Sequence, residues 1–192
     1  VAARGADLTR HLERLRPLYR DLFRRAQLFL PVSASLAQIL IDNGCPEEKV
    51  TVHHSAIDLS RFDFRERTPE PGGAVRLLFI GRLTEKKGLS YGLEALASLL
   101  RGGRELELTV IGSGEQEEAL RRQSSELGLD GAVRWLGRRT QEQVQAELMR
   151  AHLLLAPSVT ARDGDQEGIP NVLKEAMACG LPVVSTFHSG IP

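Results

Sequence analysis

Hydrophobic residues along the second half of the chain follow two alternating patterns. Short apolar runs such as Leu77-Leu-Phe-Ile80 predict strands over residues 75–81, 105–112, 132–136, 152–156 and 182–185. Apolar residues at three- and four-residue spacing predict helices over residues 88–101, 115–127, 141–150 and 170–179. Strands that alternate with such helices form βαβ units and a parallel sheet with right-handed crossovers. The predicted fold class is α/β, a Rossmann-like parallel β-sheet flanked by helices and covered on both faces.

The first 60 residues show the same alternation over fewer elements. An amphipathic helix is predicted over residues 7–27, and its apolar stripe consists of Leu8, Leu12, Leu15, Leu18, Leu22 and Phe23. A strand over residues 28–32 follows it. Ser33 is the expected N-cap of a second helix, which ends near Asn43-Gly44, and a short strand is predicted over residues 50–53.

Residues 54–74 are polar and rich in proline and glycine near their end, which predicts a linker. Within this linker, Asp58 can cap the chain or pair with Arg61. We expect that role to be structural rather than catalytic.

Composition limits the classes of function. The 25 Lys and Arg residues balance 25 Asp and Glu residues, so the formal net charge is zero and no bulk attraction to nucleic acid is implied. Cys45 and Cys179 have no partner at metal-ligand spacing and are expected to be free cytosolic thiols. There is no signal peptide, and no apolar run approaches the roughly 18 residues of a membrane span. We expect a soluble, cytoplasmic protein that is at most peripheral to a membrane.

The N-terminal region is basic, since seven of the first 30 residues are Arg. These arginines form either a solvated helix face or a surface for anionic lipid. The chain also begins with Val1 and stops at Pro192, directly after a predicted strand. We expect it to be a fragment of a larger protein.

The segment from Glu167 to Glu175 carries the strongest chemical signal. It holds two carboxylates eight residues apart around a predicted helix start, with Pro170 at the first helical position. If the helix continued backwards, Glu167, Asn171 and Glu175 would share one polar side and span roughly 12 Å. The helix start offers N–H groups and a partial positive charge for a diphosphate, and carboxylates accept hydrogen bonds from sugar and ribose hydroxyls. This combination predicts a sugar-nucleotide site.

Further candidate residues follow the predicted strands at their carboxyl ends, where parallel sheets bind ligands. They are Gly81, Arg82, Gly112, Gly114, Gly137, Ser158 and Glu167. Arg82 and Lys87 can close on a diphosphate from one side, although a solvated basic loop has the same composition. Gly112 and Gly114 either form a tight strand-to-helix turn or let a ligand approach the backbone. The third glycine of a dinucleotide fingerprint is missing, so NAD binding is not expected.

Two other motifs have competing interpretations. The segment Val133-Arg-Trp-Leu-Gly137 either offers backbone for a nucleobase or is an ordinary strand with Trp135 facing the edge. His53 and His54 are adjacent imidazoles, but no third ligand stands at a useful spacing. A structural role is favoured there, and we expect neither a metal nor a cofactor.

The motifs together resemble the retaining glycosyltransferases of the large GT4 family (group 1). They are Gly81-Arg-x4-Lys-Gly88, Gly112-Ser-Gly114, Gly168-Ile-Pro-Asn-x3-Glu-Ala-Met-Ala178 and Gly180-Leu-Pro-Val-Val-Ser-Thr186. Glu167-Gly-Ile-Pro-Asn and His188-Ser-Gly-Ile-Pro192 are closest to bacterial exopolysaccharide and colanic acid-type transferases. The resemblance covers essentially the whole chain.

The resemblance implies a GT-B fold, which has two facing Rossmann-like domains. Residues 1–60 would be the last part of the acceptor-side domain, residues 61–74 the linker, and residues 75–192 a truncated nucleotide-sugar-binding domain. The family usually has glycine before the Ile-Asp pair of the linker, where this chain has Ala56. A hinge that needs positive φ at this position would be strained.

The resemblance also implies roles for individual residues. Arg82 and Lys87 would hold the donor diphosphate, Glu167 would contact hydroxyls of the donor sugar, and Glu175 would bind the ribose. The implied catalytic residues are Glu167, Arg82 and Lys87. The implied binding residues are Gly81, Arg82, Lys87, Gly112, Gly114, Leu136, Ser158, Gly168, Ile169, Asn171, Val172, Leu173 and Glu175.

The expected function of the parent protein is that of a retaining glycosyltransferase in bacterial cell-surface polysaccharide synthesis. It would transfer a sugar from a UDP- or GDP-linked donor to a glycan or lipid-linked glycan, and this fragment alone would be inactive. One alternative is a non-catalytic sugar-nucleotide binding module. Another is a sugar-nucleotide 2-epimerase, which needs an acid/base pair that the sequence does not offer beyond Glu167 and Glu175.

Overall fold

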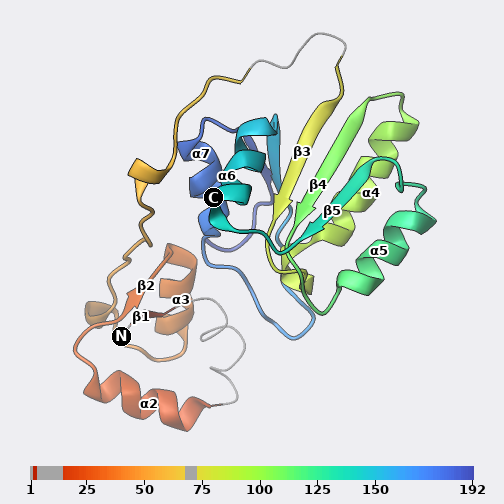
Figure 1. Ribbon diagram of the computed structural model, residues 1–192. Helices are drawn as coiled ribbons and strands as arrows, with labels where there is room; N and C mark the ends of the chain where they lie inside the picture. Colours follow the sequence, from red (N-terminus) through yellow and green to blue (C-terminus); the bar gives the residue numbers. More distant parts are fainter. Residues whose placement is uncertain (1, 4–14, 68–72) are drawn as a thin grey trace. The chain divides into compact units, whose positions relative to one another are not determined.

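The computed structural model describes residues 2–3, 15–67 and 73–192 (Figure 1). The chain divides into two compact units. The first comprises Val1–Ala56, Val159–Pro170 and Phe187–Pro192, and the second comprises Ile57–Ser158 and Asn171–Thr186. The two segments of the first unit that follow residue 158 lie within the predicted second domain, and the domain boundaries given above stay a prediction.

The second unit contains a five-stranded parallel sheet. Its strands are β3 (Val75–Ile80), β4 (Leu106–Ile111), β5 (Val133–Gly137), β6 (Leu153–Ala156) and β7 (Val183–Ser185). Their spatial order is β5-β4-β3-β6-β7, and every neighbouring pair is parallel. The chain therefore moves outward from β3 through β4 to β5, and then returns past β3 to β6. This confirms the α/β class and the five strands predicted from apolar runs.

Helices connect these strands on both sides of the sheet (Figure 1). They are α4 (Leu89–Arg101), α5 (Glu117–Glu126), α6 (Gln141–Arg150) and α7 (Asn171–Ala178). The main core lies between the sheet and α4 and α5. Leu89, Leu93 and Leu96 of α4 are almost fully buried there against Phe79 and Leu108. Each such leucine stabilises the fold by roughly 1.5–3 kcal/mol relative to an exposed one.

The other face of the sheet is covered unevenly. Leu154 of β6 is fully buried on the side of α6 and α7, as the continuous apolar run predicts. On β4 and β5, however, Glu107, Thr109 and Arg134 line an open cavity instead of a core. The expectation of two covered faces is therefore wrong for these two strands, because alternate positions on them carry polar side chains.

The first unit has a small core of its own. Its elements are β1 (Ala2–Ala3), α2 (Arg16–Arg25), β2 (Leu30–Pro31), α3 (Ala34–Asp42) and a 3₁₀ helix, Glu47–Lys49. Phe23 and Phe29 meet edge to face at 5.4 Å and pack with Leu36 and Leu40. The Ser33 side chain accepts a hydrogen bond of 3.3 Å from the Leu36 N–H, which confirms the predicted N-cap.

Three expectations for the first unit need correction or qualification. The helix predicted over residues 7–27 appears as α2, and residues 4–14 lie outside the described residues. Residues 50–53 form no strand, because only Val50 makes a β-bridge, to Phe29. The Thr51 N–H donates to the Phe29 carbonyl and the His53 N–H to the Pro31 carbonyl of β2, so this segment runs beside β2 without regular pairing. Ala56 has no positive φ, so the strain considered for it is absent.

Residues 58–67 form a strap within the second unit. The strap begins with a 3₁₀ helix, Leu59–Arg61, whose cap is Asp58: its carboxylate accepts hydrogen bonds from the Ser60 N–H and hydroxyl at 3.1 and 2.6 Å. This confirms the structural role expected for Asp58. The strap ends at Arg67, whose guanidinium donates to the carbonyls of Met149, Ala151 and Cys179 at 2.8, 2.9 and 3.0 Å.

Arg67 therefore ties the C-terminal ends of α6 and α7 together. Helix ends leave carbonyl groups without partners inside the helix, and a cation near them also interacts favourably with the helix dipole. The planar guanidinium can reach several carbonyls at once, which an ammonium group cannot do with the same geometry. Burial lowers the pKa of Arg67, so these bonds compensate for the cost of placing the charge there.

We predict that Arg67→Ala lowers the free energy of unfolding by about 2–4 kcal/mol, because three charge-assisted hydrogen bonds are lost. Arg67→Lys should recover less than half of this loss. Chemical denaturation measures both effects, with Arg65→Ala as the matched control, since the exposed Arg65 contributes its backbone N–H rather than its side chain to the contact with Cys179. Equal stability of Arg67→Ala and wild type would contradict the role of Arg67.

Candidate functional site

The carboxyl edge of the sheet has its switch point between β3 and β6. Ligands of open α/β sheets bind at the carboxyl ends of the two strands where the order reverses. Gly81 and Arg82 follow β3 directly, and Ser158 follows β6 two residues after its end. Ser158 is buried, and its carbonyl accepts a hydrogen bond from the Thr186 hydroxyl after β7. The strand order thus brings these predicted site residues to neighbouring strand ends.

The loop from Gly81 to Lys87 folds back on itself. A 3₁₀ helix, Glu85–Lys87, returns the chain so that the Lys87 stem lies over Gly81, with its Cδ and Cε 3.5 Å from where a Gly81 Cβ would be. Arg82 is exposed beside it. The predicted pair of cations therefore lies at one strand end. Lys86, which sequence reasoning did not single out, is only 6% exposed.

The backbone of the loop after β3, rather than a ligand, lies close to Gly112 and Gly114. Gly112 has φ +139°, and a Cβ there would lie 1.8 Å from the Gly81 carbonyl oxygen. A Cβ on Gly114 would lie 2.4 Å from the Leu83 carbonyl oxygen. The Leu83 N–H donates to the Ser113 carbonyl at 3.0 Å. Of the two interpretations, the tight turn describes this geometry, and the glycines support the loop that carries Arg82 and Lys87.

The end of β5 joins the same edge. The Gly137 carbonyl accepts a hydrogen bond of 2.9 Å from the Gly112 N–H, and Leu136 beside it is half-buried. The Trp135 ring instead packs against the core and carries the Arg121 guanidinium at 4.9 Å from its centroid. The Trp135 side chain is thus engaged with α5 and the core. The part of this motif that lies at the carboxyl edge of the sheet is the backbone of Leu136 and Gly137.

Helix α7 begins at Asn171, and Pro170 precedes it. The predicted position of Pro170 inside the helix is wrong by one residue. The backward continuation that would align Glu167 with Glu175 is also absent, because residues 165–170 are irregular. Asn171 and Glu175 still share one side of α7, four residues apart. Val172 is half-buried and Leu173 is buried.

Glu175 is a half-buried carboxylate. Burial raises its pKa, and the positive charges of Arg61 and Lys174 act in the opposite direction. Burial is the larger effect, so the net shift of this pKa is upward, and the two positive charges only reduce it. A half-buried carboxylate on this helix can accept hydrogen bonds from hydroxyl groups of a ligand.

Glu167 belongs to the first unit. Its neighbour Gly168 packs so closely on Val32 that a Cβ would lie 2.8 Å from a Val32 methyl group, and Gly190 packs on Ser33 in the same way. Burial lowers the pKa of His188, and the Glu167 charge opposes this effect. The Glu167 loop and the His188 loop therefore meet at the start of α3. Ile169 in the same loop is half-buried.

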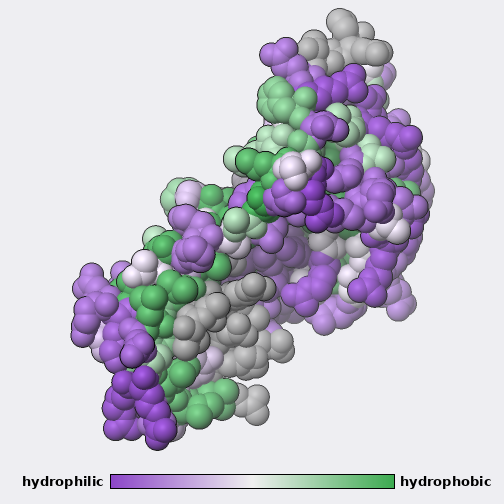
Figure 2. All heavy atoms as spheres, turned by 60° about the vertical axis from the view of Figure 1, so that its left-hand side comes forward, coloured by the Kyte–Doolittle hydropathy of each residue, from purple (hydrophilic) through white to green (hydrophobic). Residues whose placement is uncertain are grey.

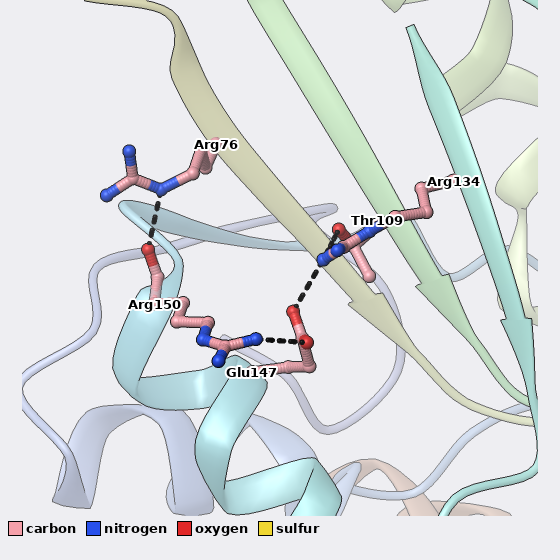
Figure 3. Close-up of polar contacts among 5 residues, drawn as sticks. All are labelled: Arg76, Thr109, Arg134, Glu147 and Arg150. Atoms are coloured by element: carbon pink, nitrogen blue, oxygen red, sulfur yellow. Dashed lines mark hydrogen bonds and ion pairs between the residues drawn. The ribbon is translucent and has the colours of Figure 1, made fainter.

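A cavity of about 650 Å³ lies at the opposite, amino edge of the sheet. Arg134 of β5 and Arg150 of α6 both point at Glu147, at 2.8 and 3.3 Å, and Arg134 also donates to the Thr109 hydroxyl (Figure 3). The Arg76 Nε donates to the Arg150 carbonyl at 2.9 Å. These side chains join α6 to the sheet and cap the C-terminal end of α6. We therefore assign this cluster to the fold and place the candidate site at the carboxyl edge.

The surface of the first unit combines both kinds of side chain expected of a basic amphipathic helix. On α2 and at its start, Leu18 and Leu15 are 65% and 41% exposed, and Arg20, Arg24 and Arg25 are exposed as well. Figure 2 shows hydrophobic and hydrophilic surface side by side on this unit. Among the helices that the structure describes, none is long and apolar enough to cross a membrane.

Comparison with known proteins places the chain. The sequence profile described as "Glycosyl transferases group 1" matches residues 60–192. The chain belongs to the group 1 glycosyltransferases. The amylovoran biosynthesis glycosyltransferase AmsK of Erwinia amylovora is 42% identical over 192 residues, which cover 98% of this chain and 46% of that protein. WcaL of Escherichia coli K12, whose name assigns it to colanic acid biosynthesis, is 42% identical over 190 residues, which cover 98% of this chain and 47% of that protein.

Solved glycosyltransferase structures share the fold. Anabaena HepE in complex with UDP-glucose superposes with a TM-score of 0.78 at 22% identity, over 98% of this chain and 54% of that protein. WaaG, a glycosyltransferase involved in lipopolysaccharide biosynthesis, gives 0.68 at 23% identity, over 93% and 52%. This confirms the predicted GT-B type of fold. The chain spans about half the length of the curated relatives it matches.

Sequence reasoning missed two features of this group 1 glycosyltransferase. The strap of residues 58–67 was predicted as a plain linker, yet it is bonded to α6 through the Arg61 carbonyl and to the ends of α6 and α7 through the Arg67 side chain. The burial of Lys86 was missed as well. Neither feature produces a periodic pattern in the sequence. The one signal for the strap is that its arginines lie close to a segment rich in proline and glycine.

We predict that Gly114→Ala lowers the free energy of unfolding by about 1–3 kcal/mol, because the new Cβ displaces the Leu83 backbone. Gly131→Ala is the matched control. Nothing lies within 4 Å of a Cβ there, so its stability should change by less than about 0.5 kcal/mol. Thermal or urea unfolding distinguishes the two variants, and equal effects would refute the close packing at Gly114.

Proposed function

We propose that the full-length protein is a retaining glycosyltransferase. It transfers a sugar from a nucleotide diphosphate sugar to a glycan or lipid-linked glycan acceptor in bacterial cell-surface polysaccharide synthesis. The observation that carries this proposal is the 42% identity, across nearly the whole chain, to AmsK, whose name assigns it to amylovoran biosynthesis. The solved complexes of HepE with UDP and UDP-glucose support a nucleotide sugar as the donor.

The donor diphosphate binds Arg82, Lys87 and the start of α7. Two cations at one strand end suit a diphosphate, and the N-terminus of a helix favours negative charge. The backbone at Gly81 forms the floor of this part of the site, since the Lys87 stem already lies against it. Ser158, at the neighbouring strand end, shapes the same edge.

The nucleoside and the donor sugar contact the remaining predicted residues. Glu175 accepts hydrogen bonds from the ribose hydroxyls, with Asn171 on the same side of α7 and with Val172 and Leu173 lining the site. The proposal assigns Glu167 to the hydroxyls of the donor sugar, and the backbone of Gly168 and Ile169 to the sugar and phosphate. Gly112, Gly114 and Leu136 support the edge on the β4 and β5 side.

The chemistry that these residues supply is stabilisation of the departing diphosphate. Negative charge grows on the phosphate oxygen as its bond to the anomeric carbon breaks. The acceptor oxygen then bonds to that carbon on the same face, and the hydroxyl proton passes to the departing diphosphate. Fixed cations and helix dipoles stabilise such charge without reorganising. Arg82, Lys87 and the α7 terminus perform this role, and Glu167 orients the sugar.

The proposal also includes a location. We place the enzyme in the cytoplasm, and a lipid-linked acceptor would bring it to the inner face of the membrane. The exposed arginines and leucines of α2 fit a peripheral contact with anionic lipid. Residues 1–60 then form the end of the acceptor-side domain and residues 75–192 most of the donor domain.

Calorimetric titration of UDP, GDP and ADP into the full-length protein tests the donor site. We expect one nucleotide to bind selectively, and Lys87→Ala to weaken its binding about tenfold or more, because charge-assisted bonds to the diphosphate are lost. Arg104→Ala, which removes an exposed cation before β4, should leave binding unchanged. If wild-type folded protein binds none of the three, the proposed donor site is wrong.

Glu167→Gln tests the separation of roles between the sugar and the nucleotide. We expect donor hydrolysis or transfer by the full-length protein to slow about tenfold to a hundredfold, because the carboxylate charge that orients the sugar is lost. Binding of the free nucleoside diphosphate should change less than about threefold, since it lacks the sugar. A variant that loses nucleotide binding and turnover to the same extent would place Glu167 at the nucleotide instead.

A further inference from the structure

A small polar pocket lies at the amino edge of the sheet, beside the larger cavity described above. This amino-edge pocket has a volume of about 120 Å³, and its walls come from the end of the strap (residues 65–67), from Arg76 of β3 and from the segment that ends α6 (residues 149–152). The two cavities share Arg76, Arg150 and Ala151, so they are neighbours. Since a cavity needs only roughly 10–15 Å³ to hold a water, the pocket has room for a group of several heavy atoms.

Two guanidinium groups in the wall are fixed by the end of α6. Nη1 of Arg67 donates to the carbonyls of Met149 and Ala151 at 2.8 and 2.9 Å. Nε of Arg76 donates to the carbonyl of Arg150, which lies between them in the chain, at 2.9 Å. The two groups therefore bind three consecutive carbonyls. These bonds serve the fold, and they also set the positions of both charges before any ligand arrives.

The bond to the helix end leaves other donors of Arg76 directed away from α6. Figure 3 shows the two outer nitrogens of Arg76 pointing away from Glu147, whereas the Arg150 guanidinium faces Glu147 at 3.3 Å. One outer nitrogen, Nη2, lies 2.6 Å from Nε2 of His152, which also lines the pocket. The other, Nη1, makes no hydrogen bond to the residues that the structure describes. Arg76 thus keeps N–H groups for a ligand.

The positive charge of the amino-edge pocket is not balanced by ion pairs. Arg65, Arg67 and Arg76 all line it, and Glu66 is the one carboxylate among its lining residues. In the described parts of the chain, ion pairs link other arginines to carboxylates, and none involves these three. Burial lowers the pKa of Arg67, and the like charge of Arg65 adds to this effect. An anion in the pocket would offset the repulsion between these charges.

The chemistry of the wall suits a phosphate group. A phosphate monoester carries about −1.5 to −2 charges near pH 7 and three strong acceptor oxygens, whereas a carboxylate carries a single charge. Guanidinium groups bind phosphate oxygens through paired N–H···O bonds. The neighbouring cavity of about 650 Å³ leaves room for the part of the molecule to which the phosphate is attached.

We propose that the amino-edge pocket binds the phosphate group of a phosphate monoester. Arg76 supplies hydrogen bonds, Arg67 supplies a fixed charge, and the exposed Arg65 adds a third charge from the strap. The site is separate from the proposed donor site, since Arg82 and Lys87 follow the carboxyl end of β3 and Arg76 stands near its amino end. The inference therefore goes beyond the proposed function and does not depend on it.

The experiment is calorimetric titration of glycerol phosphate and of inorganic phosphate into the full-length protein at low ionic strength. We expect wild type to bind glycerol phosphate with a Kd of about 1 mM or below. Arg76→Gln should weaken this binding about tenfold, because charge-assisted hydrogen bonds are lost, and Arg65→Gln about threefold. The matched control is Arg104→Gln, which removes an exposed arginine near the amino end of β4 outside the pocket and should leave binding unchanged.

Glu66→Gln provides a test of the opposite sign. Removing the carboxylate that lines the pocket should strengthen binding of glycerol phosphate about twofold to threefold, because an unfavourable charge is lost. A damaged fold cannot produce tighter binding. Thermal unfolding of Arg65→Gln and Arg76→Gln shows in addition that the weaker binding of these variants belongs to folded protein.

Two further comparisons separate the pocket from the donor site and identify the source of the phosphate. Lys87→Ala should leave glycerol phosphate binding unchanged, and Arg76→Gln should leave UDP binding unchanged. Binding to phosphatidylcholine vesicles that contain phosphatidic acid assigns the pocket to a lipid head group if Arg76→Gln weakens it, and to a soluble monoester if it does not.

Three outcomes would overturn the inference. They are no saturable binding of either phosphate compound below about 10 mM, a loss in Arg104→Gln as large as in Arg76→Gln, and a loss in Lys87→Ala with none in Arg76→Gln. The last outcome would place the phosphate at the donor site instead. Failure of the protein to bind any nucleotide would contradict the proposed function and leave the result for the amino-edge pocket standing.

Discussion

The carboxyl edge of the sheet depends on one close approach between two backbones. The loop after β3 passes directly over the loop after β4, with the Gly81 carbonyl where a side chain of Gly112 would be. Hydrogen bonds between the two loops then fix Leu83, and the turn that follows returns Lys87 to the end of β3. Without glycine at these contacts the loops would separate, and the two cations would no longer share a strand end.

The sequence allowed the second unit to be predicted almost element by element. Its strands are buried on at least one face and its helices have one apolar side, so each has a strong periodic signal. The errors occur where that signal is absent. Residues 50–53 are apolar enough for a strand, but they run beside β2 as irregular backbone. Pro170 is compatible with a first helical turn, yet the Glu167 loop packs within the first unit, and α7 starts one residue later.

The candidate site was predictable for a different reason. Parallel sheets bring all their carboxyl ends to one edge, so residues that follow strands can be grouped without knowledge of any contact. Arg82, Gly112 and Ser158 were found in this way. The strap could not be predicted in this way, because an arginine that caps helix carbonyls, such as Arg67, produces no periodic pattern in the sequence.

The charges of the second unit distinguish its two edges. At the amino edge the arginines are paired with Glu147 or bonded to helix carbonyls, so they serve the fold. At the carboxyl edge the unit exposes Arg82 and keeps Glu175 half-buried, where burial opposes its charge. A carboxylate whose charge is opposed by burial costs folding free energy, and such groups gather where ligands bind. A fold shared with many enzymes does not identify a reaction, but cations for a diphosphate beside an acceptor for hydroxyls define what this edge can recognise.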